Sequence, residues 1–69
     1  MVDWIELQSS VVSAAAYQGS SLYIRFTSDH EYEYYNVPET IYEHLLRAPS
    51  IGQYFNANIR DHYDYRQLI

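Results

Sequence analysis

The residues of this sequence that could take part in catalysis or metal binding are its histidines, its serines and its acidic side chains. His30, His44 and His62 lack the i, i+3 or i, i+4 spacing with which two side chains on one helix bind a metal ion. The chain has no cysteine, which removes thiolate metal sites and thiol nucleophiles. No serine lies in a Gly-x-Ser-x-Gly motif. We therefore expect no catalytic residues, no metal ion and no cofactor, and we expect that the protein is not an enzyme.

Ser50 and Gly52 could bind a phosphate if their backbone N–H groups lay at the start of a helix. The chain contains no lysine, however, and the glycine spacing of a Walker motif is missing. We favour another interpretation, in which Ser50 caps the helix and Gly52 allows a close packing contact with a tyrosine ring.

A first group of candidate binding residues consists of Tyr23, Arg25 and Tyr35, which we expect on the sheet face that points away from the helices. Aromatic and arginine side chains on an open sheet are one way in which proteins stack the bases of single-stranded RNA. The same residues could instead form cross-strand pairs that stabilise the sheet, or a tyrosine-rich surface that binds a protein. We favour cross-strand pairing, because Glu31 and Glu33 are expected on the same face.

A second group lies near the C-terminus and comprises Arg60, Tyr63, Tyr65 and Arg66. If RNA is bound, these residues are expected to contact its backbone. Alternatively, Arg60 pairs with an acidic neighbour and Tyr63 packs under the sheet. Both interpretations stay open, since arginine and tyrosine are also common in protein interfaces.

The charge of the chain bears on the type of partner. Nine acidic residues and four arginines give a net charge of −5 at pH 7. This charge disfavours RNA and anionic membranes, which attract basic proteins. It fits a protein partner that carries a basic patch. Since neither a secretory signal nor an apolar run of about 20 residues is visible, we expect a cytoplasmic protein.

Three strands are expected, over residues 9–17, 22–27 and 31–37. In the second, Leu22, Ile24 and Phe26 alternate with polar or amphipathic side chains, as in a strand with one buried face. Short turns separate the three segments, which predicts an antiparallel meander.

Two helices are expected after the strands. Pro38 stands at the favoured first position of a helix over residues 38–47. The second begins after Ser50, and Ile51, Phe55 and Ile59 give it an apolar face that runs toward Tyr63. We expect one α+β domain over residues 1–69, a three-stranded antiparallel meander with two C-terminal helices packed on one face (β-β-β-α-α), in which residues 1–8 form a lead-in arm and residues 64–69 a tail.

Several of these segments together resemble the KTSC domain, a family named for the C-terminus of some lysyl-tRNA synthetases and also found as stand-alone bacterial or phage proteins. The resemblance covers about residues 9–65. The family-motif positions are Tyr32, Tyr34, Pro38, Ser50, Gly52, Phe55, Asn56 and Ile59.

The resemblance implies a small domain without an established function, for which RNA binding has been suggested. Relatives often carry basic residues where this chain has Ile51, Asp61 and Asp64. We therefore expect a non-catalytic binding module that recognises another macromolecule, with a protein partner favoured over RNA.

Overall fold

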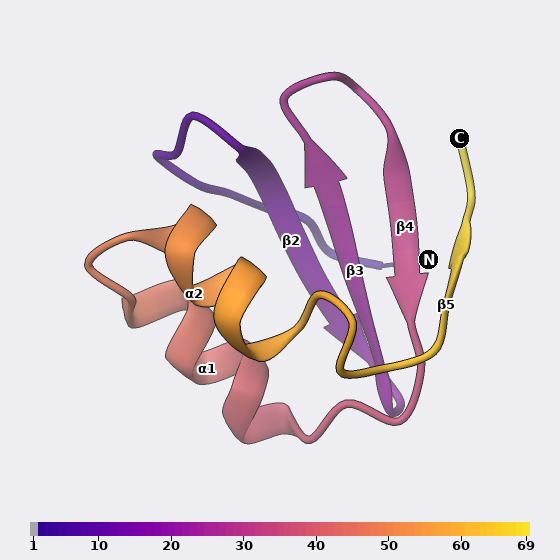
Figure 1. Cartoon of the computed structure of the whole chain (residues 1–69). Coiled ribbons are helices and arrows are strands. Elements are labelled where there is room, and N and C mark those ends of the chain that lie inside the picture. Colours follow the sequence, from indigo (N-terminus) through magenta and orange to yellow (C-terminus); the bar gives the residue numbers. More distant parts are fainter. Residues whose placement is uncertain (1) are drawn as a thin grey trace.

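The computed structural model describes residues 2–69 and shows one antiparallel sheet with two helices on one of its faces (Figure 1). The strands follow the order β1-β2-β3-β4-β5. In chain order, the elements are β1 (Ile5–Glu6), β2 (Val12–Gln18), β3 (Ser21–Phe26), β4 (Glu31–Tyr34), α1 (Glu39–Arg47), α2 (Ile51–Asn58) and β5 (Tyr65–Gln67).

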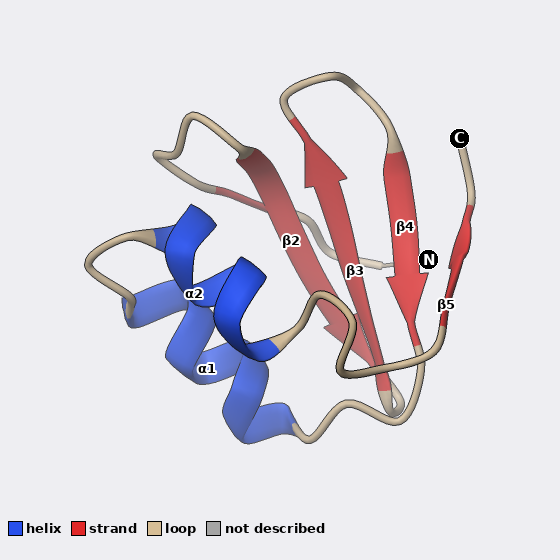
Figure 2. Cartoon of the chain, viewed as in Figure 1, coloured by secondary structure: helices blue, strands red, loops and turns tan. Residues whose placement is uncertain are grey.

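The α+β class is as predicted, but the three-stranded meander is wrong, because the sheet has five strands. The two additional strands are β1, in the predicted lead-in arm, and β5, in the predicted tail (Figure 2). Both are short and exposed, so they carry no buried alternating pattern. Strand β5 pairs with β4, and the segment of the chain between these two strands contains both helices. Met1 lies outside the described residues.

The core lies between the sheet and the helices. Leu22 and Ile24 are fully buried, and the β3–β4 register places them opposite Tyr34 and Tyr32 respectively. These four side chains therefore point to the same inner face. The helices contribute further buried residues, which are Leu45, Phe55 and Ile59.

Both helices start close to their predicted positions. Pro38 is the extended N-cap residue of α1 rather than its first helical residue. Ser50 caps α2 as predicted, and its Oγ accepts a hydrogen bond from the Gln53 backbone N–H at 3.4 Å. Helix α2 ends at Asn58, so Tyr63 lies beyond it. Among residues 2–69, neither helix has the length and apolar character needed to cross a bilayer.

The helices do not cover the inner face evenly. Figure 1 shows α1 and α2 on the β2 side of the sheet, with β4 and β5 extending beyond them. Tyr32, an inner side chain of β4, is accordingly only partly buried, whereas Tyr34 is 4% exposed.

Candidate functional site

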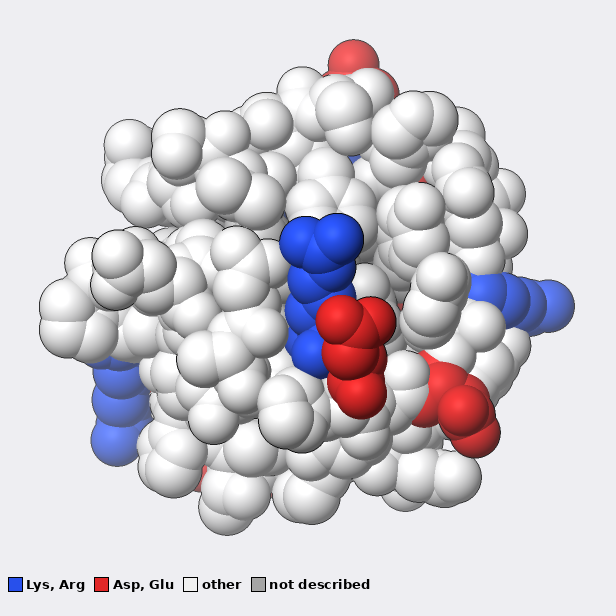
Figure 3. All heavy atoms as spheres, in the orientation of Figure 1, with Lys and Arg blue, Asp and Glu red and all other residues white. Residues whose placement is uncertain are grey.

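Two of the four arginines, but only two of the nine acidic residues, take part in the ion pairs of the described residues. Among residues 2–69, two ion pairs are found, Arg25–Glu31 and Arg66–Glu33. In the view of Figure 3 the surface is mostly uncharged, and one arginine is seen beside an acidic side chain near the middle. The acidic residues that lie outside these two pairs are all exposed, and they are Asp3, Glu6, Asp29, Glu39, Glu43, Asp61 and Asp64.

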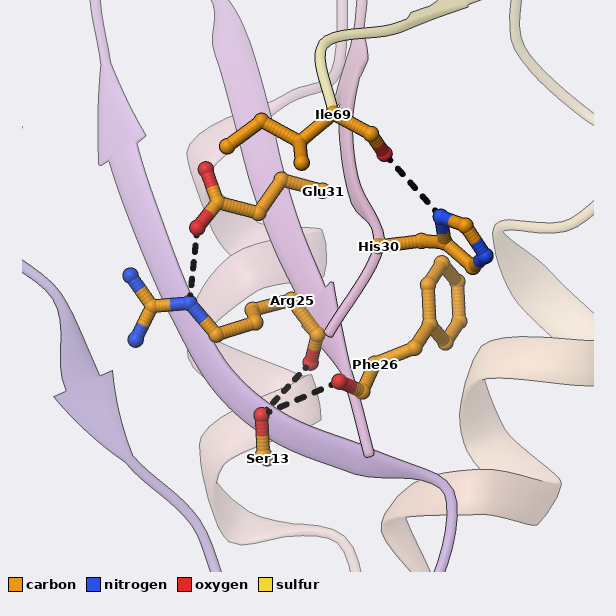
Figure 4. Close-up of polar contacts among 6 residues, drawn as sticks. All are labelled: Ser13, Arg25, Phe26, His30, Glu31 and Ile69. Atoms are coloured by element: carbon orange, nitrogen blue, oxygen red, sulfur yellow. Dashed lines mark hydrogen bonds and ion pairs between the residues drawn. The ribbon is translucent and has the colours of Figure 1, made fainter. Parts of the chain in front are cut away.

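The outer sheet face carries Tyr23 and Arg25, as the strand pattern predicts, but this face is not open. The Arg25 Nε donates to Glu31 Oε2 at 2.9 Å, on the side of the sheet opposite to Phe26 and His30 (Figure 4). Its guanidinium carbon also lies 4.4 Å from the centroid of the Trp4 ring. The Trp4 ring in turn makes an edge contact with Tyr23, with centroids 6.4 Å apart. Trp4 thus covers residues that could otherwise stack a base.

Glu33 is the centre of a second polar cluster on this face. Although acidic, it is only 9% exposed. Its carboxylate accepts hydrogen bonds from Ser21 Oγ at 2.7 Å, the Tyr23 hydroxyl at 3.4 Å and Arg66 Nε at 3.3 Å. Burial, followed by the charge of Glu33, raises the pKa of Tyr23. The outer face is therefore built from cross-strand contacts that engage both Arg25 and Arg66.

Tyr35 directly follows the end of β4 and lines a hollow that includes neither Tyr23 nor Arg25. Its backbone N–H donates to the Asp64 carbonyl at 2.8 Å. Together with Tyr63, it lines a shallow hollow that also includes the exposed residues Asp61 and His62. No three His, Cys, Asp or Glu side chains in the described part of the chain are placed to hold a metal ion.

Aromatic side chains line a cleft of about 330 Å³ on the inner side of the sheet, beside α2. We call it the aromatic cleft. Neighbouring rings of its wall lie 5.3–6.3 Å apart between centroids, in edge-to-face, tilted or stacked pairs. These rings belong to Phe26, Tyr32, Tyr34, Phe55 and Tyr65. The other lining residues are Val11, Ser28, His30, Asn56, Arg60 and Asp61.

The Tyr34 hydroxyl is the unusual polar group of the aromatic cleft. Tyr34 is 4% exposed, and its hydroxyl forms no hydrogen bond with another of residues 2–69. No side-chain polar atom in this range is sealed from solvent without a partner, so the hydroxyl keeps some contact with solvent, and Tyr34 is one of the residues that line the cleft. Burial, followed by the nearby Tyr32 and Tyr65, raises the pKa of Tyr34 to about 12, while Arg60 acts in the opposite direction. The hydroxyl is therefore a protonated, unused hydrogen-bond donor at neutral pH.

The C-terminal group predicted from the sequence is divided among three places. Arg60 and Tyr65 line the aromatic cleft, Tyr63 packs partly buried against the core, and Arg66 lies on the outer face with Glu33. Arg60 is exposed and forms no ion pair within residues 2–69. Its neighbour Asp61 has a positive φ of 66°, which turns the chain sharply after α2.

The sequence did not reveal the aromatic cleft. The sequence left open whether Tyr32 and Tyr34 or their neighbours face the core, and the register, which pairs them with Ile24 and Leu22, puts the two tyrosines on the inner face. No local pattern in the sequence indicates that β4 lies beyond the helices. Nor does any local pattern indicate that the Tyr65 ring packs on Tyr34, with centroids 5.5 Å apart.

The remaining family-motif positions have structural roles or line a second hollow. Ile59 is fully buried in the core. A Cβ added to Gly52 would lie 3.2 Å from Val11 Cγ2, so the close neighbour of this glycine is Val11 and not the expected tyrosine ring. Ser50, Gly52 and Asn56 line a hollow without a charged side chain, which gives no support to phosphate binding there.

Comparison with known proteins places these features in a family. The model of the KTSC domain matches residues 8–63. The chain is 40% identical over 63 residues to a lysine–tRNA ligase of Nostoc sp., and this match covers 88% of the chain but 11% of the ligase. The chain therefore spans about one tenth of the length of the ligases it matches. A protein of Tsukamurella paurometabola is 36% identical over 56 residues, which cover 78% of this chain and 84% of that protein.

A solved structure has the same fold. The crystal structure of a KTSC domain protein from Yersinia pestis superimposes with a TM-score of 0.94 over the full length of both chains, at 24% sequence identity.

Proposed function

Because this chain belongs to the KTSC domain family, we propose that it is a non-catalytic binding module whose partner is a protein with a basic patch. The observation that carries this proposal is the division of charge described above. Arg25 and Arg66 are each engaged by a glutamate, whereas seven of the nine acidic side chains are exposed and outside the two ion pairs. The charge offered to a partner is thus predominantly negative, which attracts a basic protein surface.

RNA binding is the second candidate function. Its support is that the matching Nostoc protein is a lysine–tRNA ligase, which acts on tRNA. Aromatic rings and an unpaired Arg60 in one cleft are also suited to a stacked base and its phosphate. Against it stands the small number of unpaired arginines, since affinity for nucleic acid depends on neutralising several phosphates.

One NMR experiment separates the two candidates. Isotope-labelled protein is titrated, at low and moderate salt, with a basic peptide of alternating arginine and glycine and, separately, with a short mixed single-stranded RNA. A peptide in which glutamate replaces arginine is the matched control. We expect saturable amide shifts near exposed carboxylates with the basic peptide only, and weaker binding at higher salt.

The opposite result would replace this proposal by RNA binding. It consists of RNA-induced shifts that weaken steeply with salt and are lost in Arg60→Ala or Arg66→Ala, but kept in Arg47→Ala. Arg47 is a suitable control because it is exposed on α1 and does not line the aromatic cleft.

A further inference from the structure

We propose that the aromatic cleft is where the partner docks, and that it receives one aromatic side chain from a peptide segment flanked by arginine or lysine. This inference rests on the proposed function and adds to it a site and the chemistry of the occupant. Three features of the cleft support it: its ring-lined wall, the unpaired Tyr34 hydroxyl and the charge at its mouth.

The ring-lined wall selects an aromatic anchor. Tyr65 closes one side of the cleft while remaining 56% exposed, so its ring still has area to cover. The rings of Tyr32 and Tyr34 lie next to it at 5.4 and 5.5 Å. An inserted ring can extend these tilted contacts and remove a large apolar area from water. The cleft volume of about 330 Å³ is at the lower end of ligand pockets, which suits one side chain.

The Tyr34 hydroxyl selects a hydrogen-bond acceptor next to that anchor. A bound segment that excluded water from this hydroxyl without bonding to it would lose affinity. Every peptide backbone carries a carbonyl at each residue, and such a carbonyl is the nearest acceptor that a peptide brings into the cleft. Asn56 and Arg60 supply further donors in the same cleft, which fits an extended backbone rather than an apolar surface alone.

The charges at the mouth select basic flanks. Asp61 lines the cleft, Asp64 lies in the adjoining hollow, and Asp29 immediately precedes the lining residue His30. Arg60 is the sole arginine among the lining residues. Its planar guanidinium can stack on an aromatic anchor without requiring an anionic partner. The lining itself holds one arginine and one aspartate, so the attraction for arginine or lysine beside the anchor comes from Asp64 in the adjoining hollow and from the net charge of −5 of the chain.

The test uses blocked pentapeptides of defined sequence. The probe has arginine at both ends, glycine at the second and fourth positions and tryptophan at the centre. One control replaces tryptophan by alanine, and another replaces both arginines by glutamate. Amide NMR titrations should give shifts around β4, β5 and the end of α2, and affinity should fall at least about fivefold for each control peptide, as expected for loss of an aromatic anchor or of its flanking charges.

Matched variants identify the groups responsible. Tyr34→Phe keeps the ring and removes the hydroxyl, so it should weaken the probe about twofold to tenfold, as for the loss of one hydrogen bond. Tyr42→Phe is its control, since Tyr42 stacks on Tyr17 outside the cleft. Asp61→Asn should also weaken the probe, and asparagine tolerates the positive φ at this position. Its control is Glu39→Gln on α1, which removes the same charge.

The outcomes separate this inference from the proposed function. If the alanine peptide binds as well as the probe, or if Tyr34→Phe and Tyr42→Phe behave alike, the cleft is not the docking site, although binding of basic peptides still stands. If no basic peptide binds even at low salt, both proposals fail. If single-stranded RNA shifts the cleft amides and the peptides do not, the occupant is a nucleic acid and the inference is wrong.

Discussion

Arg25 lies between an aromatic ring and a carboxylate: its guanidinium carbon is 4.4 Å from the Trp4 ring centroid, and its Nε is 2.9 Å from Glu31. Trp4→Ala should therefore lower the free energy of unfolding by about 1–2 kcal/mol, through loss of the cation–π contact and of buried area. Trp4→Phe should retain about half of this stability. Urea unfolding of both variants measures the difference. Equal stability of Trp4→Ala and the original protein would show that the arm does not hold the outer face.

In the polar cluster around Glu33, replacing Glu33 should lower the free energy of unfolding more than replacing Arg66. Arg66 is 66% exposed at its side chain, so Arg66→Ala should cost less than about 1 kcal/mol, as for other solvent-screened ion pairs. Glu33→Ala removes the acceptor for Ser21 and Tyr23 as well as Arg66, and should cost about 2–3 kcal/mol. Thermal and urea unfolding measure both variants. A larger loss from Arg66→Ala than from Glu33→Ala would contradict this order.

Phe55 joins α2 to the sheet and is 3% exposed, with edge contacts to Phe26 and Tyr34. Phe55→Ala should cost roughly 3–5 kcal/mol, as for other buried aromatic residues. This is a large share of the stability of a domain of this size. Circular dichroism during heating measures the loss, and Asn56→Ala, which changes the exposed neighbour on the same helix, is the control. An unchanged melting temperature in Phe55→Ala would mean that α2 does not pack through this ring.

Gly52 and Val11 provide a test of close packing. Alanine at position 52 gains helix propensity, but its Cβ would lie 3.2 Å from Val11 Cγ2. The two effects should nearly cancel in Gly52→Ala, whereas in a Val11→Ala background the same change should stabilise the protein by about 0.5–1 kcal/mol. A double-mutant cycle by urea unfolding measures this coupling. If the coupling energy is zero, close approach to Val11 is not the reason for glycine here.

Stability should fall at alkaline pH because of Tyr34. Burial and the neighbouring tyrosines raise its pKa from 10.0 to about 12 in the folded protein. Between these values the unfolded chain loses the Tyr34 proton while the folded protein keeps it, so the unfolded state is favoured as the pH rises. Tyr34→Phe should reduce the loss of stability between pH 10 and 12. Urea unfolding across this range measures the effect, and an identical pH profile for both proteins would place the Tyr34 hydroxyl outside the buried environment.

The parts of the fold that the sequence predicted are those with a strong local pattern. The alternation of Leu22, Ile24 and Phe26 located β3, and the Ser50 cap located the start of α2. The short strands β1 and β5 have two and three residues, all exposed, so periodicity could not identify them. Their existence depends on pairing with β2 and β4, which is a long-range property of the folded sheet.

The same limit applies to the site. The sequence placed Tyr23, Arg25 and Glu33 on one face, but could not indicate that Trp4 covers that face. It also could not indicate that Tyr65 lies beside Tyr34, because this contact depends on β5, which follows both helices, pairing with β4. Residue types therefore suggested which side chains could bind, whereas the order of strands determined which of them lie together.

The pairing of β4 with β5 also has a kinetic consequence. The first four strands pair with their neighbours in sequence, but β5 closes a segment that includes α1 and α2. Closing this longer loop costs more entropy, so β5 should dock last in folding and open first in native-state fluctuations. Each opening would release Arg66 from Glu33 and withdraw Tyr65 from Tyr34 at once. Opening of this one three-residue strand would thus alter both faces of the sheet at the same time.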